Sequence, residues 1–157
     1  RRAAGFVGIP EENLQKSPFE LSGGQKRRVA IAGVIAMEPD CIVLDEATAM
    51  LDPVGRQEVL STIHRLNKEK GITVILITHH MNEAENADHV IVMDDGVVAM
   101  EGTPKEVFQK VEELRSIGLT VPDTVDLLDR LQKDGWNVPL DALTVEECAD
   151  VIVSALR

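Results

Sequence analysis

The sequence predicts an α/β fold in which parallel strands are joined by helices, followed by a small helical domain. Two short runs, Cys41–Leu44 and Ile72–Ile77, are almost wholly apolar, as expected for strands covered on both faces. Helical patterns lie before, between and after these runs, and this order implies parallel strands with right-handed crossovers. From Pro104 onward the apolar residues recur at helical spacing.

Local signals give the element boundaries: a capping residue or proline at a helix start, and Gly or Pro beyond its end. Asp52-Pro53 starts the central helix and Gly71 ends it, while Glu38-Pro39 ends the helix before the first strand. The predicted elements are a helix end at Arg1–Val7, a short turn at Glu11–Gln15, helices at Gln25–Met37 and Asp52–Lys70, strands at Cys41–Leu44 and Ile72–Thr78, a short helix at Asn82–Asn86, a hairpin of Val90–Met93 and Val97–Met100 around Asp94-Asp95-Gly96, and helices at Lys105–Ile117, Asp123–Lys133 and Val145–Leu156.

Composition narrows the function classes. The net charge of −11 argues against nucleic acid as a partner, because duplex binding needs a basic footprint. Cys41 and Cys148 lie in apolar or helical runs, which is typical of buried thiols in a reducing compartment. The longest apolar stretch, Val29–Met37, falls short of the roughly 18 residues that a membrane helix needs. We therefore expect an intracellular chain that reaches a membrane only through a partner.

A glycine-rich loop, Leu21-Ser22-Gly23-Gly24-Gln25, directly precedes a predicted helix. Two glycines let backbone N–H groups approach an anion, and the helix adds its positive N-terminal end. Ser22 contributes a hydroxyl donor. Ser-Gly-Gly alone is better explained as an ordinary helix cap and turn, but the whole pentapeptide before the basic run Lys26–Arg28 is far more specific for an anion-binding loop.

Two carboxylates, Asp45 and Glu46, follow the first predicted strand. A nucleotide-hydrolysing site needs one carboxylate to hold Mg²⁺, usually through water, and another to orient or deprotonate the attacking water. A solvated strand end explains the pair equally well when it is taken alone. His79 follows the second strand and is expected at the same sheet edge, where it could donate to a terminal phosphate. His80 is its neighbour, and spacing alone does not choose between them.

Asp52 has a simple structural explanation. A side-chain cap before Pro53 at the start of a helix accounts for it fully. The loop Ala49–Asp52 could at the same time face a partner, and the two interpretations are compatible.

Four motifs in this order resemble the second half of an ABC transporter nucleotide-binding domain, which is a P-loop NTPase: LSGGQ as signature, CIVLDE as Walker B, AMLD as D-loop and ITHH as the switch-histidine loop. The resemblance covers residues 17–84. It implies that Asp45 is the Mg²⁺-associated aspartate, Glu46 the catalytic glutamate and His79 the switch histidine. It further implies that the loop Ser22–Gln25 contacts ATP held by a partner subunit, with Asp52 in the D-loop.

A narrower similarity concerns the longer segments SPFELSGGQKRRVAIAGVIAM, EATAMLDPVGR and ITHHMNEAENADHVIVMDDG, which resemble the ATPase subunits of energy-coupling factor transporters. This implies an ATP-hydrolysing subunit that drives uptake of vitamins or transition-metal ions from the cytoplasmic face of the membrane. Its implied partners are a second ABC ATPase subunit in a paralogous heterodimer, a transmembrane coupling subunit and a substrate-binding membrane subunit. Ala47 fits one of the two paralogues.

The same similarity sets two structural expectations. Many ABC ATPases have Arg where Gly33 stands, and a glycine inside a helix costs roughly 1 kcal/mol against alanine, so we expect Gly33 to allow close helix packing. The ATPase portion is expected over residues 1–103, and residues 104–157 are expected to form a helical C-terminal extension like that of the family.

The sequence departs from the family in its first half. It contains neither the phosphate-cradling G-x-x-x-x-G-K-[ST] motif nor the adenine-stacking aromatic and Q-loop glutamine of the family. With Arg1 in place of a starting Met, we expect an N-terminally truncated chain that is inactive alone. Two alternatives remain: a non-catalytic dimerisation or binding module, and a soluble ABC ATPase of translation or DNA repair. The acidic composition and the importer-like sequence around Gly33 disfavour the latter.

Overall fold

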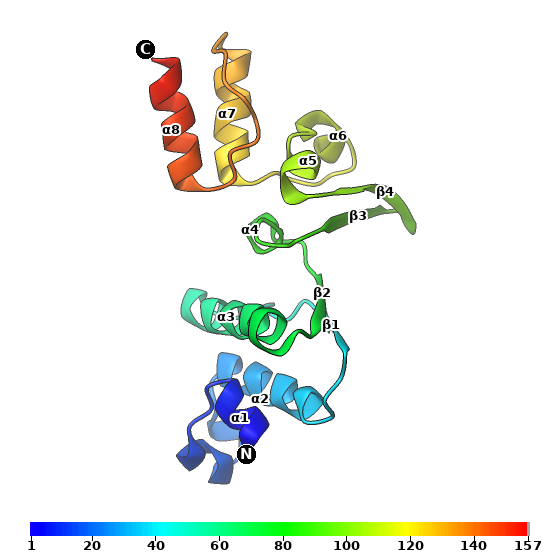
Figure 1. The fold of residues 1–157 in the computed structure, drawn as a ribbon, viewed down its shortest axis with the longest axis vertical. Coiled ribbons are helices and arrows are strands. Elements are labelled where there is room, and N and C mark those ends of the chain that lie inside the picture. The colour runs from blue at the N-terminus through cyan, green and yellow to red at the C-terminus, as the bar shows by residue number, and fades with distance from the viewer. Residues whose placement is uncertain (157) are drawn as a thin grey trace. The chain divides into compact units, whose positions relative to one another are not determined.

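The computed structural model describes residues 1–156, and the chain divides into two compact units, residues 1–78 and 79–157, each described by itself. The first unit contains α1 (Arg2–Phe6), the 3₁₀ turns η1 (Glu11–Gln15) and η2 (Pro18–Glu20), α2 (Gly23–Ile35), β1 (Cys41–Asp45), α3 (Pro53–Lys70) and β2 (Thr73–Ile77). The second contains α4 (Met81–Ala84), β3 (Val90–Asp94), β4 (Val97–Gly102), α5 (Pro104–Phe108), α6 (Val111–Ser116), α7 (Asp123–Lys133) and α8 (Val145–Ala155) (Figure 1).

The sheet of the first unit confirms the predicted parallel arrangement. β1 and β2 pair in parallel from Cys41 opposite Thr73 to Asp45 opposite Ile77, so both strands end at the same edge. α3 connects them, as a crossover between parallel strands requires. The sequence thus predicts both the strands and their relative direction.

The prediction that both faces of this sheet are buried is wrong. Ile42 is buried against the helices, but Val43 is 60% exposed and Ile75 49% exposed on the opposite face. The predicted burial of Cys41 is wrong for the same reason, because it lies on the uncovered face and is exposed. An apolar run shows that a strand is compatible with burial on both faces. Whether each face is buried depends on the elements that pack against it.

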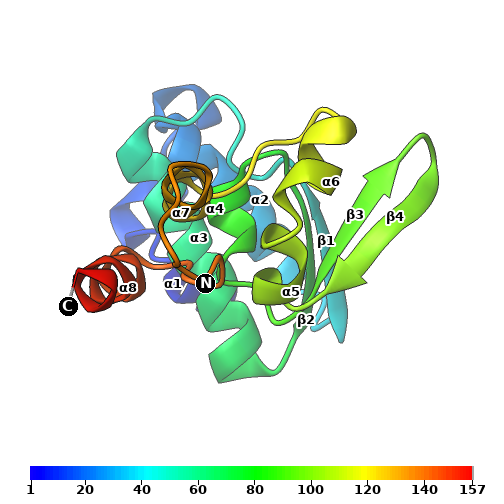
Figure 2. The same ribbon diagram turned by 90° about the horizontal axis from the view of Figure 1, so that it is seen from above.

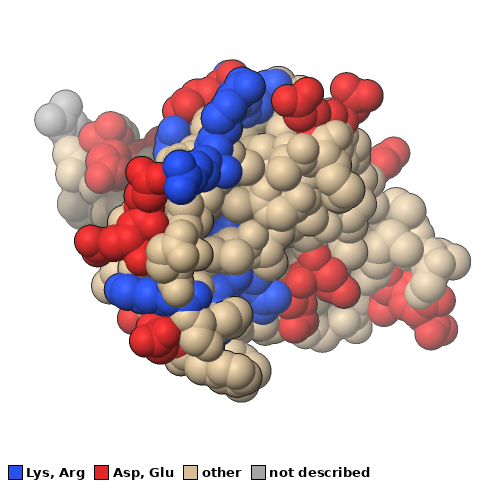
Figure 3. Space-filling model, turned by 90° about the horizontal axis from the view of Figure 1, so that it is seen from below, with Lys and Arg blue, Asp and Glu red and all other residues tan. Residues whose placement is uncertain are grey.

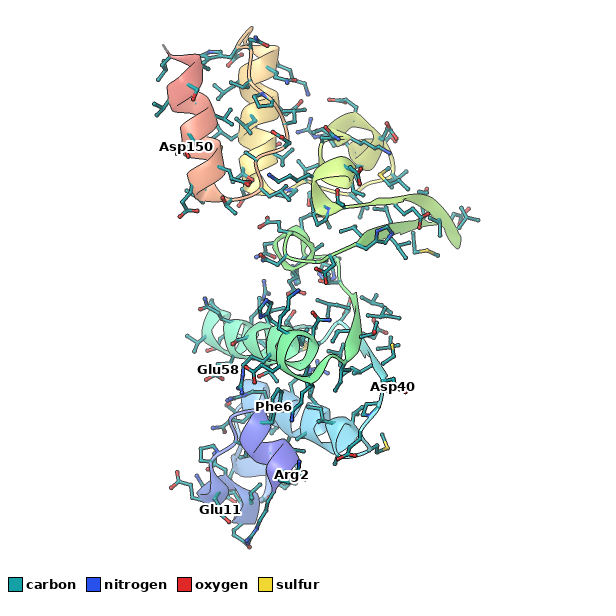
Figure 4. All side chains as sticks on the ribbon, viewed as in Figure 1. Arg2, Phe6, Glu11, Asp40, Glu58 and Asp150 are labelled. Atoms are coloured by element: carbon teal, nitrogen blue, oxygen red, sulfur yellow. The ribbon has the colours of Figure 1, made fainter. Side chains whose placement is uncertain are left out.

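The core of the first unit lies between the sheet and helices α1 to α3. Arg65 on α3 secures α1, because its guanidinium lies 4.7 Å from the centre of the Phe6 ring and donates to the Phe6 carbonyl at 3.0 Å. Figure 4 shows Phe6 between α1 and α3. The buried members of this core are Val7, Ile9, Ile31, Ala32, Ile35, Ile42, Ala47, Val59, Ile63, Leu66 and Ile72.

The hairpin of the second unit has the predicted turn. Asp95 and Gly96 both have positive φ, 46° and 80°, which gives the turn the backbone twist that favours a tight hairpin. α5 and α6 lie to one side of the hairpin (Figure 2), and Phe108 and Leu114 are among the residues that fill the space between them. The predicted domain boundary between residues 103 and 104 falls inside this unit, where Thr103 caps α5, and it stays a prediction.

One predicted helix is wrong. The sequence predicts a single helix at Lys105–Ile117, but α5 ends at Phe108 and α6 begins at Val111. Lys110 between them has ψ of 54°, outside the helical region. The apolar residues keep helical spacing across this break, so periodicity does not detect it. Helices α7 and α8 form where they were predicted. None of the described helices combines the length and apolarity needed to cross a membrane.

Candidate functional site

The glycine-rich loop lies at the start of α2, with Ser22 as its N-cap. The Gln25 N–H donates to Ser22 Oγ at 3.2 Å, and the Ser22 N–H donates to Gln25 Oε1 at 3.0 Å. This reciprocal capping box fixes the loop. The N–H groups of Gly23 and Gly24 lie in the first turn, where a helix offers them no backbone acceptor. Ser22 Oγ accepts one bond and keeps its own proton for donation, so the hydroxyl and the first-turn N–H groups are candidate donors to an anion at this helix end.

The two carboxylates lie at the carboxyl end of β1. Asp45 is its last residue, and the Glu46 N–H donates to the Ile77 carbonyl at 2.9 Å, so Glu46 continues the pairing with β2 by one bond. Glu46 then turns out of the strand with φ of 44°, a conformation uncommon for a residue with a side chain. Both residues are exposed.

The residues present fit a magnesium site of the substrate-assisted kind. Mg²⁺ is commonly held by one or two carboxylates together with substrate phosphates rather than by a protein cage. Among residues 1–156, no three His, Cys, Asp or Glu side chains gather into such a cage. Asp45 is exposed and has no ion pair within the described part of the chain, so its oxygens are available to a hydrated cation.

Asp52 is a helix cap, as its position predicts. Its Oδ1 accepts the Gly55 N–H at 3.1 Å, and Pro53 occupies the first helical position of α3. The close approach of α3 to the glycine-rich loop was not predicted. A Cβ placed on Gly24 would lie 3.1 Å from the Gly55 Cα, and both glycines are buried. Gly55 in the first turn of a helix, where glycine is unfavourable, is the sequence signal that could have revealed this contact.

The predicted close packing at Gly33 is wrong. A Cβ built on Gly33 would meet no atom within 4 Å, and the residue is exposed. Gly24, nine residues earlier in the same helix, is the position where helix packing demands glycine.

The two candidate histidines lie together at the start of the second unit. Their ring centres are 4.2 Å apart with the planes tilted by 40°. His79 is exposed, whereas His80 is half-buried and precedes α4 as its N-cap residue. This difference favours His79 as the side chain that can reach a ligand from solution, and His80 as the one tied to the local fold.

Charges of both signs share the molecular surface. On the face drawn in Figure 3, basic side chains form small groups beside acidic ones, with uncharged surface between them. In the first unit Arg28, near the middle of α2, is buried, and its Nη2 donates to Glu58 Oε2 at 2.9 Å. Figure 4 shows Glu58 on the side of α3 that faces α2.

Comparisons of the sequence with known proteins agree on a family. The family model described as ABC transporter matches residues 1–49. The chain is 56% identical to energy-coupling factor transporter ATP-binding protein EcfA1 of Caldanaerobacter subterraneus, over 93% of this chain and 59% of the relative. It is 51% identical to EcfA2 of Geobacillus kaustophilus, over 94% of this chain and 51% of the relative. The chain therefore spans little more than half the length of these curated relatives.

Solved structures extend this likeness to the fold. The structure of cbiO1 from Clostridium perfringens, part of the ABC transporter complex cbiONQ, is 41% identical and matches with a TM-score of 0.65 over 84% of this chain and 51% of its own. The ATP-binding cassette MJ0796, in a dimeric post-hydrolysis state bound to ADP and Pi, is 33% identical with a TM-score of 0.57 over 66% of this chain and 44% of its own. In its motifs, its parallel sheet and these relatives, the chain is similar to ABC transporter ATPases, and in particular to the ATP-binding proteins of energy-coupling factor transporters.

Proposed function

We propose that this chain belongs to the ATP-hydrolysing subunit of an energy-coupling factor importer that drives uptake of vitamins or transition-metal ions. The observation that carries the proposal is the placement of the signature loop and the two carboxylates within one unit. Ser22 to Gln25 present donors at the start of α2, and Asp45 and Glu46 follow β1 at the sheet edge. The 51–56% identity to transporter ATP-binding proteins supports the transport role over a soluble ATPase of translation or DNA repair.

The proposed chemistry is attack of water on the γ-phosphorus of ATP, with release of ADP. Glu46 accepts the proton of the attacking water as the new P–O bond forms and the bond to the β–γ bridging oxygen breaks. Such general-base assistance is worth about 10²–10⁴-fold in rate. Mg²⁺, held by Asp45 through water, would neutralise phosphate charge. His79 donates a hydrogen bond to the γ-phosphate.

The signature loop acts on a different nucleotide. Ser22 Oγ and the N–H groups of Gly23 and Gly24 close over ATP held by a second ABC ATPase subunit, while Gln25 fixes the loop through its capping bond to Ser22. Asp52 caps α3, and we propose that the D-loop to which it belongs lies at the same subunit interface. The whole protein then acts as a peripheral subunit on the cytoplasmic face, paired with a paralogous ATPase and attached to a transmembrane coupling subunit and a substrate-binding membrane subunit. Residues 104–157 form its helical C-terminal extension.

Substitution of the proposed base tests this function in the assembled transporter. Glu46→Gln keeps the size and polarity of the side chain but removes its basicity. We expect ATP turnover to be lost while ATP-driven closure of the two ATPase subunits persists. Glu69→Gln, at an exposed carboxylate on α3, is the control and should hydrolyse ATP normally. Near-normal hydrolysis by Glu46→Gln would refute the assignment of the base.

A second pair of variants separates the two histidines. His79→Ala should lose turnover because a donor to the γ-phosphate is gone. His80→Ala should retain it, because His80 is the half-buried neighbour that begins α4. Loss of turnover in His80→Ala alone would reverse the assignment.

A further inference from the structure

The N-terminal ends of α2 and α3 meet through two glycines. A Cβ on Gly24 would lie 3.1 Å from Gly55 Cα, and a Cβ on Gly55 would lie 3.6 Å from Gly24 Cα. The same Cβ on Gly55 would lie only 2.7 Å from Asp52 Oδ1, closer than side-chain carbon atoms are found to other atoms. The backbones of the two helices therefore touch with no side chain between them, and a methyl group on Gly55 would displace the Asp52 carboxylate.

Two more contacts join the same turn of α2 to the connection between β1 and α3. A Cβ on Gly23 would lie 3.1 Å from Leu51 Cδ2, so Leu51 covers the signature loop from one side. Further along α2, Arg27 Nη2 donates to the Glu46 carbonyl at 3.4 Å. The signature loop and its helix thus contact the connection at its beginning, near its end and in the first turn of α3.

The connection itself holds two residues in a sparsely populated conformation. Glu46 has φ of 44° and Met50 has φ of 61°, values that cost free energy for residues with side chains. Such conformations persist where surrounding contacts determine them. The contacts with α2 are positioned to do so.

We propose that Gly55 is a positioning residue that joins the signature loop and the residue 46–55 connection into one packed body. The proposal rests on the proposed function, in which the signature loop acts on the partner's ATP and Glu46 acts on the ATP of its own subunit. A body that contains both elements couples the two nucleotides. When Ser22 binds the γ-phosphate of the partner's ATP and the signature loop moves, Glu46 moves with it at the ATP of its own subunit. A packed contact transmits displacement because protein interiors have little free volume.

The size of the expected effect follows from the geometry. A methyl group on Gly55 must move the Asp52 carboxylate away from its capping position on α3, because a separation of 2.7 Å is too short for contact. A misplacement of about 1 Å in a catalytic arrangement can lower the rate on the order of 10²-fold. We therefore expect Gly55→Ala to lower kcat by about tenfold to a hundredfold.

The experiment uses the full-length gene product in its assembled transporter. It measures kcat, the Hill coefficient for ATP and the affinity for ADP, which lacks the γ-phosphate that the signature loop would contact. Gly55→Ala should lower kcat at least about tenfold and bring the Hill coefficient towards one, with ADP affinity unchanged. Gly33→Ala is the matched control, since it adds the same methyl group to an exposed glycine of α2 with no atom within 4 Å, and it should match the wild type.

Leu51→Ala keeps the test decisive if Gly55→Ala does not fold, because it removes the side chain against Gly23 without adding bulk. We expect it to lower kcat severalfold with ADP affinity intact. Wild-type kcat in folded Gly55→Ala, or in Leu51→Ala where Gly55→Ala is unfolded, overturns the positioning role. Absence of ATP hydrolysis by the wild type instead overturns the proposed function, so the two failures are distinguishable.

Discussion

Arg28 on α2 binds Glu58 on α3 through a 2.9 Å bond between Nη2 and Oε2, although the arginine side chain is 11% exposed and the glutamate side chain 44% exposed. The other terminal nitrogen, Nη1, donates to the carbonyls of Val7 and Gly8 at 3.2 and 3.3 Å. One buried guanidinium therefore connects the end of α1 to α2 and α3. The same two helices carry the signature loop and the Asp52 cap, so this ion pair joins the elements that position the candidate site.

Neutralising Glu58 should destabilise the first unit. Glu58→Gln keeps a hydrogen-bond acceptor near Arg28 but leaves the buried guanidinium without its counter-charge, and we expect a loss of about 1–2 kcal/mol in the free energy of unfolding. Glu69→Gln makes the same change at an exposed pair on the same helix, where Arg65 and Glu69 are four residues apart, and should have no measurable effect. Equal losses in urea denaturation of the two variants would contradict a structural role for the buried pair.

Two glycines that meet no neighbouring atoms should respond in opposite directions to alanine. Gly33 lies inside α2, so Gly33→Ala should raise the free energy of unfolding by up to about 1 kcal/mol. Gly71 ends α3 with φ of 66°, and Gly71→Ala should lower it by about 1 kcal/mol because an L side chain is strained there. Thermal denaturation of both variants measures the two signs. Stabilisation by Gly71→Ala would mean that α3 does not end in the left-handed conformation.

The second unit should lose stability in acid through Asp129. Burial on its own raises the pKa of this carboxyl, but hydrogen bonds from Lys133 at 2.9 Å and Arg115 at 2.8 Å outweigh it and hold the pKa below its ordinary value. The depressed pKa contributes stability that is fully present above the unfolded-state pKa of about 3.9. That contribution declines as the pH falls from there through the folded-state pKa.

Asp129→Asn should therefore be less stable than the wild type at neutral pH. The difference in the free energy of unfolding between the two proteins should narrow below about pH 4. Trp136, the single tryptophan of the chain, packs against the core next to α7 and reports unfolding of this unit by fluorescence. Asp134→Asn, at the exposed C-cap of the same helix, is the control and should follow the wild type at each pH. A gap that stays constant down to pH 2 would show that the Asp129 carboxylate is not responsible.

Elements whose cause lies within a few neighbouring residues were predictable from the sequence. α3 runs from Pro53 to Lys70 as predicted, because Asp52 caps one end and Gly71 closes the other within a few residues. The signature loop was also placed at a helix start from its own residues. The contact of Gly24 with Gly55 is not predictable in this way, because it joins residues that are distant in the sequence through the packing of two helices. The prediction of strand burial is wrong for a related reason, because burial depends on which elements cover each face of the sheet.

Thiol reactivity distinguishes the two cysteines in the 157-residue chain. Cys41 is exposed on the open face of β1, whereas Cys148 on α8 is buried, and burial raises the pKa of its thiol. The thiolate is the reactive form, so Cys148 is disfavoured both by access and by ionisation.

We expect an aromatic disulfide reagent at pH 8 to label one thiol rapidly in the folded chain and a second only after denaturation. Cys41→Ser should remove the rapid phase and Cys148→Ser the slow one. Rapid labelling of the Cys41→Ser variant would show that the core around α8 opens readily, and protection of Cys41 would show that the face of β1 is covered in solution.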